Sequence, residues 1–256
     1  MCLVLLAVEK HPNYKLVIAA NRDEYYDRSS SKAGFWKEAP EILAGRDLVG
    51  GGTWLGISKK GRIGLLTNYR DPQSRRQDAP SRGALVSGYL LGKQSPVQYL
   101  EEVREKAHLF NGFNLVVGNK DKIYYYSNRT GEISKLPPGI HGLSNHLLNT
   151  PWPKVVRGKQ GISRLMEDSG DVLVEKLFEL LKDTHVAADE LLPNTGVGLD
   201  WERILSPIFI TSPSYGTRSS TLLLIGRNGY VSFLERSFNS KAECISSVKF
   251  EFRIEA

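Results

Sequence analysis

Residues 2–24 read CLVLLAVEKHPNYKLVIAANRDE: two apolar runs, a polar turn between them and four polar residues at the end. The runs at 2–8 and 14–20 have the length and the leucine and valine content of buried strands, and His11-Pro12-Asn13 is a turn signal. We therefore predict a hairpin. Because the start of the first strand of a hairpin lies beside the end of the second, Asn21-Arg22-Asp23-Glu24 is expected next to the beginning of the chain.

The rest of the chain adds further strand pairs and helices. We predict strands at residues 53–58, 62–67, 113–119, 122–128, 220–226, 230–236 and 242–253, a short strand end at 142–145, and helices at 84–91, 96–109, 154–167 and 172–181. Residues 25–40 and 184–199 are expected to be irregular. The many hairpins favour antiparallel pairing, without the regular strand–helix alternation of a parallel sheet. The prediction is an α+β fold of two antiparallel sheets between helices, forming a single domain over residues 1–256.

The composition is that of an ordinary globular protein, with 256 residues of which 41% are hydrophobic and 24% charged. A chain of this size buries a core without help from a disulfide or a metal ion. Cys2 and Cys244 do not form a disulfide framework, and no cysteine–histidine cluster has the spacing of a zinc site. We predict no metal and no required cofactor. The run at 2–8 is too short for a signal peptide or a membrane span, so we expect no transmembrane segment and a cytoplasmic location.

The net charge is +6, and the densest basic cluster contains Arg70, Arg75, Arg76 and Arg82. One interpretation of this cluster is a solvated surface loop, and the other is a rim that guides an anionic ligand. The basic residues are not interleaved with aromatic residues, and we therefore expect no nucleic-acid partner.

Cys2 is the candidate nucleophile. Removal of the initiator methionine would leave Cys2 with both a thiol and a free α-amine. An α-amine has a pKa of about 8 and can act as a general base near neutral pH, so one residue would supply nucleophile and base. The alternative is that Cys2 is a small buried hydrophobic residue of its strand.

The tetrapeptide that follows the hairpin has two interpretations as well. Arg22 would favour the thiolate of a neighbouring cysteine, and Asp23 would hold or orient an α-amine. The structural alternative is a network of ion pairs that closes the hairpin.

Several short segments accompany Cys2 and the tetrapeptide in a fixed order. They are GGTWLG at 51–56, TNYR at 67–70, FNGFNL at 110–115, GLSN at 142–145 and TRSST at 217–221. With these segments, which span about residues 1–224, the chain resembles the NRDE family, the family of the transport and Golgi organisation proteins. The family takes its name from the tetrapeptide at 21–24.

The NRDE family is in turn similar to the penicillin V acylase and bile-salt hydrolase group of N-terminal-nucleophile hydrolases. This resemblance implies a four-layer αββα fold and cleavage of a linear amide (C–N) bond by an N-terminal cysteine. It implies catalytic roles for Cys2, Arg22, Asp23 and Asn145, with Asn145 as an oxyanion donor shortly before residues 149–151. In that group the arginine and the aspartate are separated by two residues, whereas Arg22 and Asp23 are adjacent.

The substrate-binding residues that we predict on the same basis are Asn21, Asn68, Trp54 and Arg218. Asn68 belongs to a stretch that lines the pocket in the related enzymes, and Arg218 resembles a late active-site arginine. The glycines before Trp54 serve backbone geometry. For Trp54 itself, packing and ligand contact both stay open, because large aromatic side chains are mainly buried.

These observations lead to a first functional hypothesis and leave alternatives. The first is a hydrolase acting on a small-molecule amide or acyl compound. The second is a non-catalytic protein of the same fold that binds or traffics haem or an acyl lipid, with Cys2, His141 or His146 as the iron ligand, although no haem-attachment motif is present. A third is a purely structural role through protein contacts.

Overall fold

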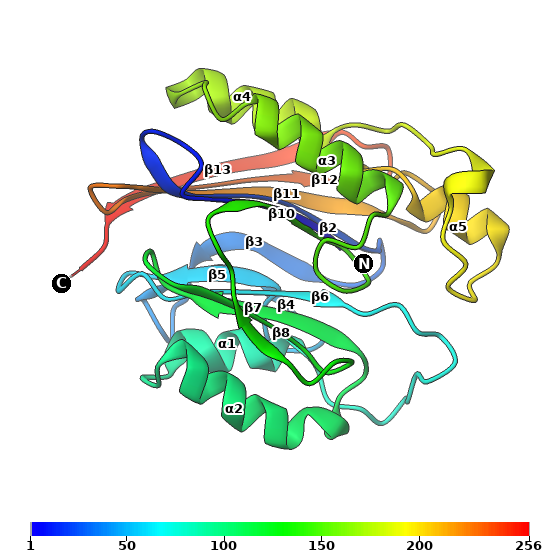
Figure 1. Ribbon diagram of the computed structural model, residues 1–256, viewed down its shortest axis with the longest axis horizontal. Coiled ribbons are helices and arrows are strands. Elements are labelled where there is room, and N and C mark those ends of the chain that lie inside the picture. The colour runs from blue at the N-terminus through cyan, green and yellow to red at the C-terminus, as the bar shows by residue number, and fades with distance from the viewer. Residues whose placement is uncertain (1, 256) are drawn as a thin grey trace.

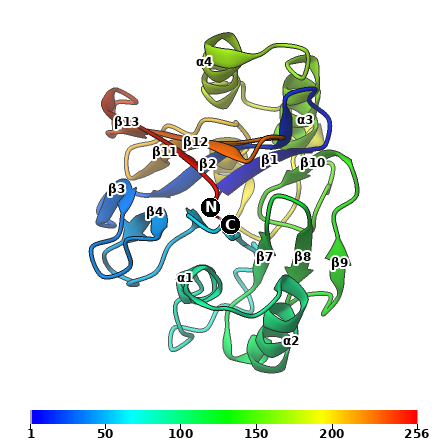
Figure 2. The ribbon, with the colours of Figure 1, turned by 90° about the vertical axis from the view of Figure 1, so that its left-hand side faces the viewer.

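The computed structural model describes residues 2–255, except for the side chain of Cys2. Two antiparallel sheets lie face to face, and helices cover the outer face of each (Figure 1, Figure 2). Helices α1 (Gly83–Leu91) and α2 (Pro96–Lys106) lie on one side, and α3 (Pro153–Arg164) and α4 (Gly170–Leu181) lie on the other. The α+β class and the four αββα layers are as predicted.

The first sheet has six strands in the order β10-β1-β2-β11-β12-β13. The strands are β1 (Cys2–Val8), β2 (Tyr14–Tyr25), β10 (Gly139–Leu143), β11 (Tyr215–Gly226), β12 (Tyr230–Phe238) and β13 (Cys244–Arg253). Val8 pairs with Leu16 and Cys2 with Arg22, so the predicted hairpin and the position of the tetrapeptide are confirmed.

Strand β2 continues through the tetrapeptide to Tyr25 instead of ending at Ala20. Its polar residues are accommodated in a central strand because they have partners on β11. Thr217 Oγ1 donates to Asp23 Oδ1 at 2.7 Å, and Ser220 Oγ donates to Asn21 Oδ1 at 2.6 Å. Hydrogen-bonded polar groups can be buried at little cost, and the apolar pattern alone therefore predicted too short a strand.

The second sheet has seven strands in the order β3-β4-β5-β6-β7-β8-β9. They are β3 (Ser30–Phe35), β4 (Ile42–Asp47), β5 (Leu55–Ser58), β6 (Ile63–Asn68), β7 (Phe113–Gly118), β8 (Ile123–Ser127) and β9 (Ile133–Lys135). The expectation that residues 25–40 are irregular is wrong for β3. This edge strand is largely exposed and has a register shift between Ser31 and Gly34. It therefore lacks the apolar alternation by which a strand is recognised.

The core explains why the first strand is apolar at every position. Val4, Leu6 and Val8 pack between the two sheets, whereas Leu3, Leu5 and Ala7 pack under α3 and α4. Alternate side chains of a strand point to opposite faces, so a strand covered on both faces is apolar throughout. Burying each such leucine or valine contributes about 1.5–3 kcal/mol.

The remaining elements connect the layers. A 3₁₀ turn, η1 (Ala107–Leu109), extends α2, and η2 (Asp189–Leu191) is the one regular turn within the described residues 184–198, which were expected to be irregular. Helix α5 (Leu199–Leu205), which was not predicted, follows directly. Within residues 2–255, no helix is both long and apolar enough to cross a membrane.

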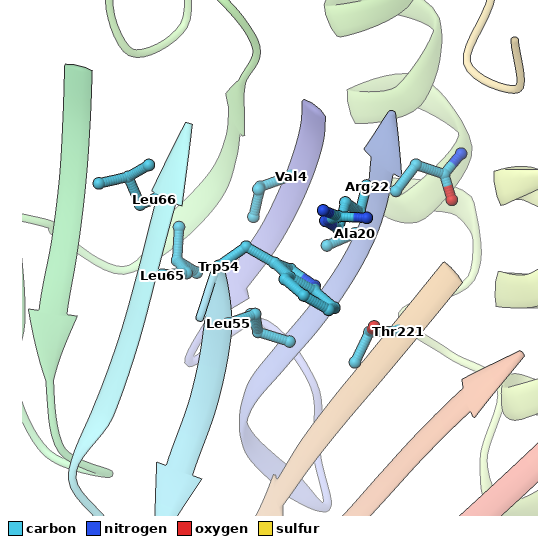
Figure 3. A pocket seen from close by; sticks show the side chains of 9 residues that line it. Val4, Ala20, Arg22, Trp54, Leu55, Leu65, Leu66 and Thr221 are labelled. Carbon is cyan, nitrogen blue, oxygen red and sulfur yellow. The ribbon is translucent and has the colours of Figure 1, made fainter. Parts of the chain in front are cut away.

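The glycines at 50–52 position Trp54, which precedes β5. Gly51 has a φ of 74°, and a Cβ on Gly52 would lie 2.3 Å from the carbonyl carbon of Gly83 at the start of α1. Only glycine allows this backbone conformation and this close approach without strain. The contact fixes the segment from which Trp54 projects into the space between the sheets (Figure 3).

Candidate active site

Three of the predicted site residues, Cys2, Arg22 and Asn145, come together where β1 begins. Cys2 pairs with Arg22 on one side, and on the other Val4 pairs with Leu143, the last residue of β10. Asn145 follows two residues after Leu143 and is therefore adjacent to the start of β1. The backbone thus brings residues from the start of β1, the end of β2 and the end of β10 together at one end of these three neighbouring strands. The contacts of the Cys2 thiol lie outside the described part of the chain.

Arg22 lies between the two sheets. Its side chain is 5% exposed, and its Cζ lies 4.3 Å from the centroid of the Trp54 ring. Figure 3 shows Trp54 reaching across from β5 toward Arg22 on β2. Arg22 Nη1 also donates to Ser30 Oγ at 3.5 Å. Among the side chains that the structure describes, no carboxylate forms an ion pair with Arg22. The contact with the Trp54 ring is therefore the main interaction of the Arg22 guanidinium.

Asp23 points to the opposite face of the sheet. Besides the Thr217 hydroxyl that donates to its side chain, its carbonyl oxygen accepts a hydrogen bond from Tyr215 at 2.9 Å. Burial raises the pKa of the Asp23 carboxyl, and the positive charge of Lys154 is the largest influence that opposes this rise. Arg22 and Asp23 therefore cannot act side by side on one group, because neighbouring residues of a strand face opposite ways.

Asn145 and Asn68 form the third part of the site. Asn145 is fully buried, and its Nδ2 donates to the carbonyl oxygen of Asn68 at 2.8 Å. The carbonyl oxygen of Asn145 accepts a hydrogen bond from the backbone N–H of Arg70 at 2.7 Å. An amide nitrogen carries two protons. The bond to Asn68 uses one of them.

The predicted basic cluster is divided between different environments. Arg70 is buried, forms a 2.5 Å ion pair with Glu202 of α5 and lies 4.8 Å from the centroid of the Trp152 ring. Arg82 Nη1 donates to the carbonyl oxygen of Gly112. The interpretation as a single solvated loop is therefore wrong for Arg70. Its burial follows from the ion pair with Glu202, which is distant in sequence and cannot be anticipated from local composition.

Arg218 lies at an irregularity of β11. Thr217 pairs with Asp23 and Ser219 with Arg22, so Arg218 is an extra residue between two neighbouring pairs. Such a β-bulge redirects the side chain of the extra residue. Arg218 Nη1 donates to the carbonyl oxygens of Tyr25, Tyr26 and Arg28, at 2.9, 3.0 and 3.3 Å. These bonds fix the guanidinium beside the end of β2 and the segment that follows it.

Two cavities flank Trp54. The first lies between the sheets, and its lining is mostly apolar: Val4, Ala20, Asn21, Arg22, Trp54, Leu55, Leu65, Leu66 and Thr221 (Figure 3). The second lies toward β3 and β11–β13, and most of its lining residues are polar or charged, including serines, Lys32, Arg218 and Glu235. Trp54 packs against the inter-sheet core and lines both cavities, so both interpretations of Trp54 are consistent with its position.

Comparison with known proteins gives the family. Residues 1–240 match the family described as "Transport and Golgi organisation 2". The chain belongs to this family. It is 38% identical to the "Transport and Golgi organization 2 homolog" of Mus musculus, with 94% of each chain covered, and 38% identical to the Homo sapiens homologue, again with 94% of each covered. The family predicted from the tetrapeptide and its accompanying segments is confirmed.

A solved structure shares the fold. The mutant C2A of conjugated bile acid hydrolase from Clostridium perfringens matches with a TM-score of 0.50 at 9% identity. The match covers 98% of this chain and 92% of that chain. The likeness confirms the fold expected for this Transport and Golgi organisation 2 family member, which is like that of N-terminal-nucleophile hydrolases.

Asn21, a predicted substrate-binding residue of this family member, forms hydrogen bonds within the fold instead. Asn21 Nδ2 donates to the carbonyl oxygens of Leu181 and Ile208, at 2.8 and 2.9 Å, and its Oδ1 accepts from Ser220. These bonds tie β2 to the end of α4 and support a structural role for the Asn21 side chain.

The two histidines considered as iron ligands are also engaged. His141 Nε2 and Nδ1 contact the Pro137 carbonyl and the Asn149 amide, and His146 Nε2 and Nδ1 contact Tyr69 and Thr150. Within the described part of the chain, no group of three or more His, Cys, Asp or Glu side chains could hold a metal ion. Because both ring nitrogens of each histidine are used, these side chains do not fit a preformed haem-iron site.

Sequence reasoning missed two buried charged residues near the site. Lys154, in the first turn of α3, is 2% exposed and acts electrostatically on Asp23. Glu235, on β12, is also 2% exposed and lines the polar cavity. In the sequence, Lys154 has the position of an ordinary polar residue of an amphipathic helix. Glu235 has the position of a residue on the solvent-facing side of a strand. Only the tertiary packing distinguishes them from surface charges.

Proposed function

We propose that this chain is a cysteine amidohydrolase that cleaves a linear C–N bond, with Cys2 as its N-terminal nucleophile after removal of Met1. The observation that carries the proposal is the strand register, which pairs Cys2 with Arg22 and brings Asn145 beside the same strand end. A buried guanidinium without a carboxylate partner among the described side chains would stabilise a thiolate next to it.

The proposed reaction has two steps. The Cys2 sulfur attacks the carbonyl carbon of the amide, and its own α-amine accepts the thiol proton and passes it to the leaving nitrogen. Water then attacks the resulting thioester, which releases the carboxylic acid and restores the thiol. The second proton of Asn145 Nδ2 would donate to the oxyanion of each tetrahedral intermediate, and loss of one such donor typically lowers the rate about 10²–10³-fold.

Asp23 and the apolar cavity have supporting roles in this proposal. Asp23 lies on the opposite face from Arg22 and would orient the N-terminal amine, while Lys154 favours its ionised form. An acyl group at this place would contact Val4, Leu55 and Leu65, and the cavity there, which has room for about one water, would have to widen to admit it. The solved protein of similar fold is named a conjugated bile acid hydrolase, which is consistent with hydrolysis as the activity of this fold.

The test is hydrolysis of a panel of N-acyl amides by protein whose N-terminal residue is Cys2, verified by mass. We expect Cys2→Ala to abolish turnover and to leave the circular dichroism spectrum unchanged. Cys244→Ser is the matched control, because Cys244 is exposed on β13, and this variant should retain full turnover. Turnover that survives in Cys2→Ala would exclude the proposed nucleophile.

A further inference from the structure

The polar cavity beside Trp54 has features of a ligand site that the proposed reaction does not use. It lies between the edge strand β3 and strands β11–β13, and its empty volume, which includes the open side, is about 620 Å³. The side chains that matter for its chemistry are Lys32, Trp54, Arg218, Ser219 and Glu235. Trp54 separates this cavity from the apolar cavity next to Arg22.

Two arginines, the half-buried Arg218 and the buried Arg22, lie in this region, and Glu24 and Asp27 also act electrostatically on Arg218. Arg218 lines the cavity, and Arg22 is the β2 residue that pairs with Ser219, the next residue of β11. Within residues 2–255, neither guanidinium forms an ion pair with a described side chain. Burial lowers the pKa of Arg218, and the charge of Arg22 lowers it further. The two guanidinium charges repel each other, so a bound anion would relieve that repulsion.

Two buried donors at the cavity have no hydrogen-bond partner among the described residues. Ser219 is 5% exposed, and its Oγ is unpaired. Arg218 Nε is unpaired as well, although Arg218 Nη1 is held by three carbonyl oxygens. A buried polar group without a partner is destabilising, because it has given up its hydrogen bonds to water. Such groups are rare in folded proteins, and a ligand that accepts from both would remove the cost.

The carboxyl group of Glu235, which also lines this cavity, is held by hydrogen bonds within the protein. Its Oε1 accepts from the Ala33 backbone N–H at 2.7 Å, and its Oε2 accepts from Thr221 Oγ1 at 3.2 Å. Both oxygens therefore have protein partners. Burial raises the pKa of Glu235, which favours the neutral acid.

We propose that the cavity between β3 and β11–β13 binds an oxyanionic group, a carboxylate or a phosphate, through Arg218 Nε, Ser219 Oγ and the charge of Arg22. Binding of the anion does not depend on hydrolysis. A second consequence does rest on the proposed function: the substrate would carry its anionic group on the polar side of Trp54 and its amide on the side of Cys2.

The test measures anion binding directly, in the full-length Cys2→Ala protein so that turnover cannot contribute. Inorganic phosphate and, separately, sodium acetate are titrated by isothermal calorimetry at constant ionic strength, with sodium chloride as the reference. We expect saturable binding of at least one of the two anions, and the tighter one assigns phosphate or carboxylate chemistry.

Variants then locate the binding. Arg218→Gln should raise the dissociation constant of the anion at least tenfold. Ser219→Ala, which removes only an unpaired hydroxyl, should raise it about threefold. Arg236→Gln is the matched control, because Arg236 is a half-buried arginine that pairs with Glu175 outside the cavity, and it should bind as the parent does. No saturable binding, or equal binding in Arg218→Gln, Ser219→Ala and the parent, would overturn the proposal. If the anion binds to Cys2→Ala but the protein with Cys2 intact hydrolyses no amide, only the proposed hydrolysis is rejected.

Discussion

Glu235 shows at the scale of one residue how burial gives a side chain a pH dependence. It lies on β12, almost without exposure, and bridges the two sheets through the backbone N–H of Ala33 on β3. Burial is the main cause that raises the pKa of its carboxyl above the ordinary value of 4.5, while the Ala33 and Thr221 hydrogen bonds act in the other direction. The folded protein therefore holds the Glu235 proton to higher pH than the unfolded chain does.

The sign of the resulting stability change follows from proton linkage. Below pH 4.5 both states are protonated, and the contribution of Glu235 to stability is fully present. As the pH rises from there through the raised folded-state pKa, the unfolded chain has already lost the proton, and this contribution is lost. Glu235→Gln removes the effect but keeps an acceptor for Ala33. We expect the melting temperature of the variant minus that of the parent to increase with pH above 4.5, measured by circular dichroism. A difference that is flat or falls would contradict this account.

At the scale of elements, the buried ion pair connects the segment after β6 to helix α5. Arg70 and Glu202 have side chains that are each 4% exposed, and Glu202 Oε1 also accepts from the backbone N–H and the hydroxyl of Thr195. Burial lowers the pKa of Arg70, and Glu202 opposes this change. A buried charge that loses its partner is strongly destabilising. The pair therefore fixes the chain near Asn68 and Asn145.

We expect Arg70→Met to lower the free energy of unfolding by about 3–5 kcal/mol, since it leaves the Glu202 carboxylate buried without its counter-charge. The double variant Arg70→Met/Glu202→Gln should recover most of this loss, because glutamine keeps the acceptor for Thr195. Urea denaturation measures both values. Arg203→Ala is the matched control on the same helix: its pairs with Asp189 and Asp200 are exposed, and its stability should stay close to that of the parent. A double variant as unstable as Arg70→Met would show that packing, and not charge, explains the loss.

The same scale shows what the sequence could predict. The hairpin, helices α1–α4 and the family were predictable because they depend on local apolar patterns and on short segments in order. Strand β3 was not, since its polar edge pairs with β4 without an apolar alternation. The position of Arg22 beside the chain start followed from hairpin geometry, whereas the contact of Trp54 with Arg22 was not predicted. The burial of Lys154, Glu202 and Glu235 depends on residues distant in sequence, so it could only be seen in the structure.

At the scale of the whole molecule, one core joins the two sheets. Leu6, Ile18 and Phe233 come from the first sheet and Leu65 and Val116 from the second, and all belong to the same buried cluster. Neither sheet can expose this face to water without losing the burial that stabilises both. The sheets should therefore unfold together.

We predict a single unfolding transition, with coincident midpoints in far-ultraviolet circular dichroism and in tryptophan fluorescence. The fluorescence reports on both halves. Trp36 packs against the core under the second sheet and Trp54 lies between the sheets, whereas Trp152 packs under α3 and α4 and Trp201 contacts Tyr215 of β11. Phe233→Ala, in the shared core, should lower the free energy of unfolding by about 3–5 kcal/mol. It should therefore lower both midpoints together. Separate midpoints for the two probes would contradict the expected single domain.

The central claim is that Cys2 is an activated N-terminal nucleophile. The most direct measurement is the intact mass of protein from its native host before and after brief treatment with iodoacetamide, with peptide mapping of Cys2 and Cys244. We predict that Met1 is absent and that Cys2 is alkylated much faster than Cys244, although Cys244 is exposed. Retention of Met1, or a Cys2 that reacts no faster than Cys244, would contradict the account.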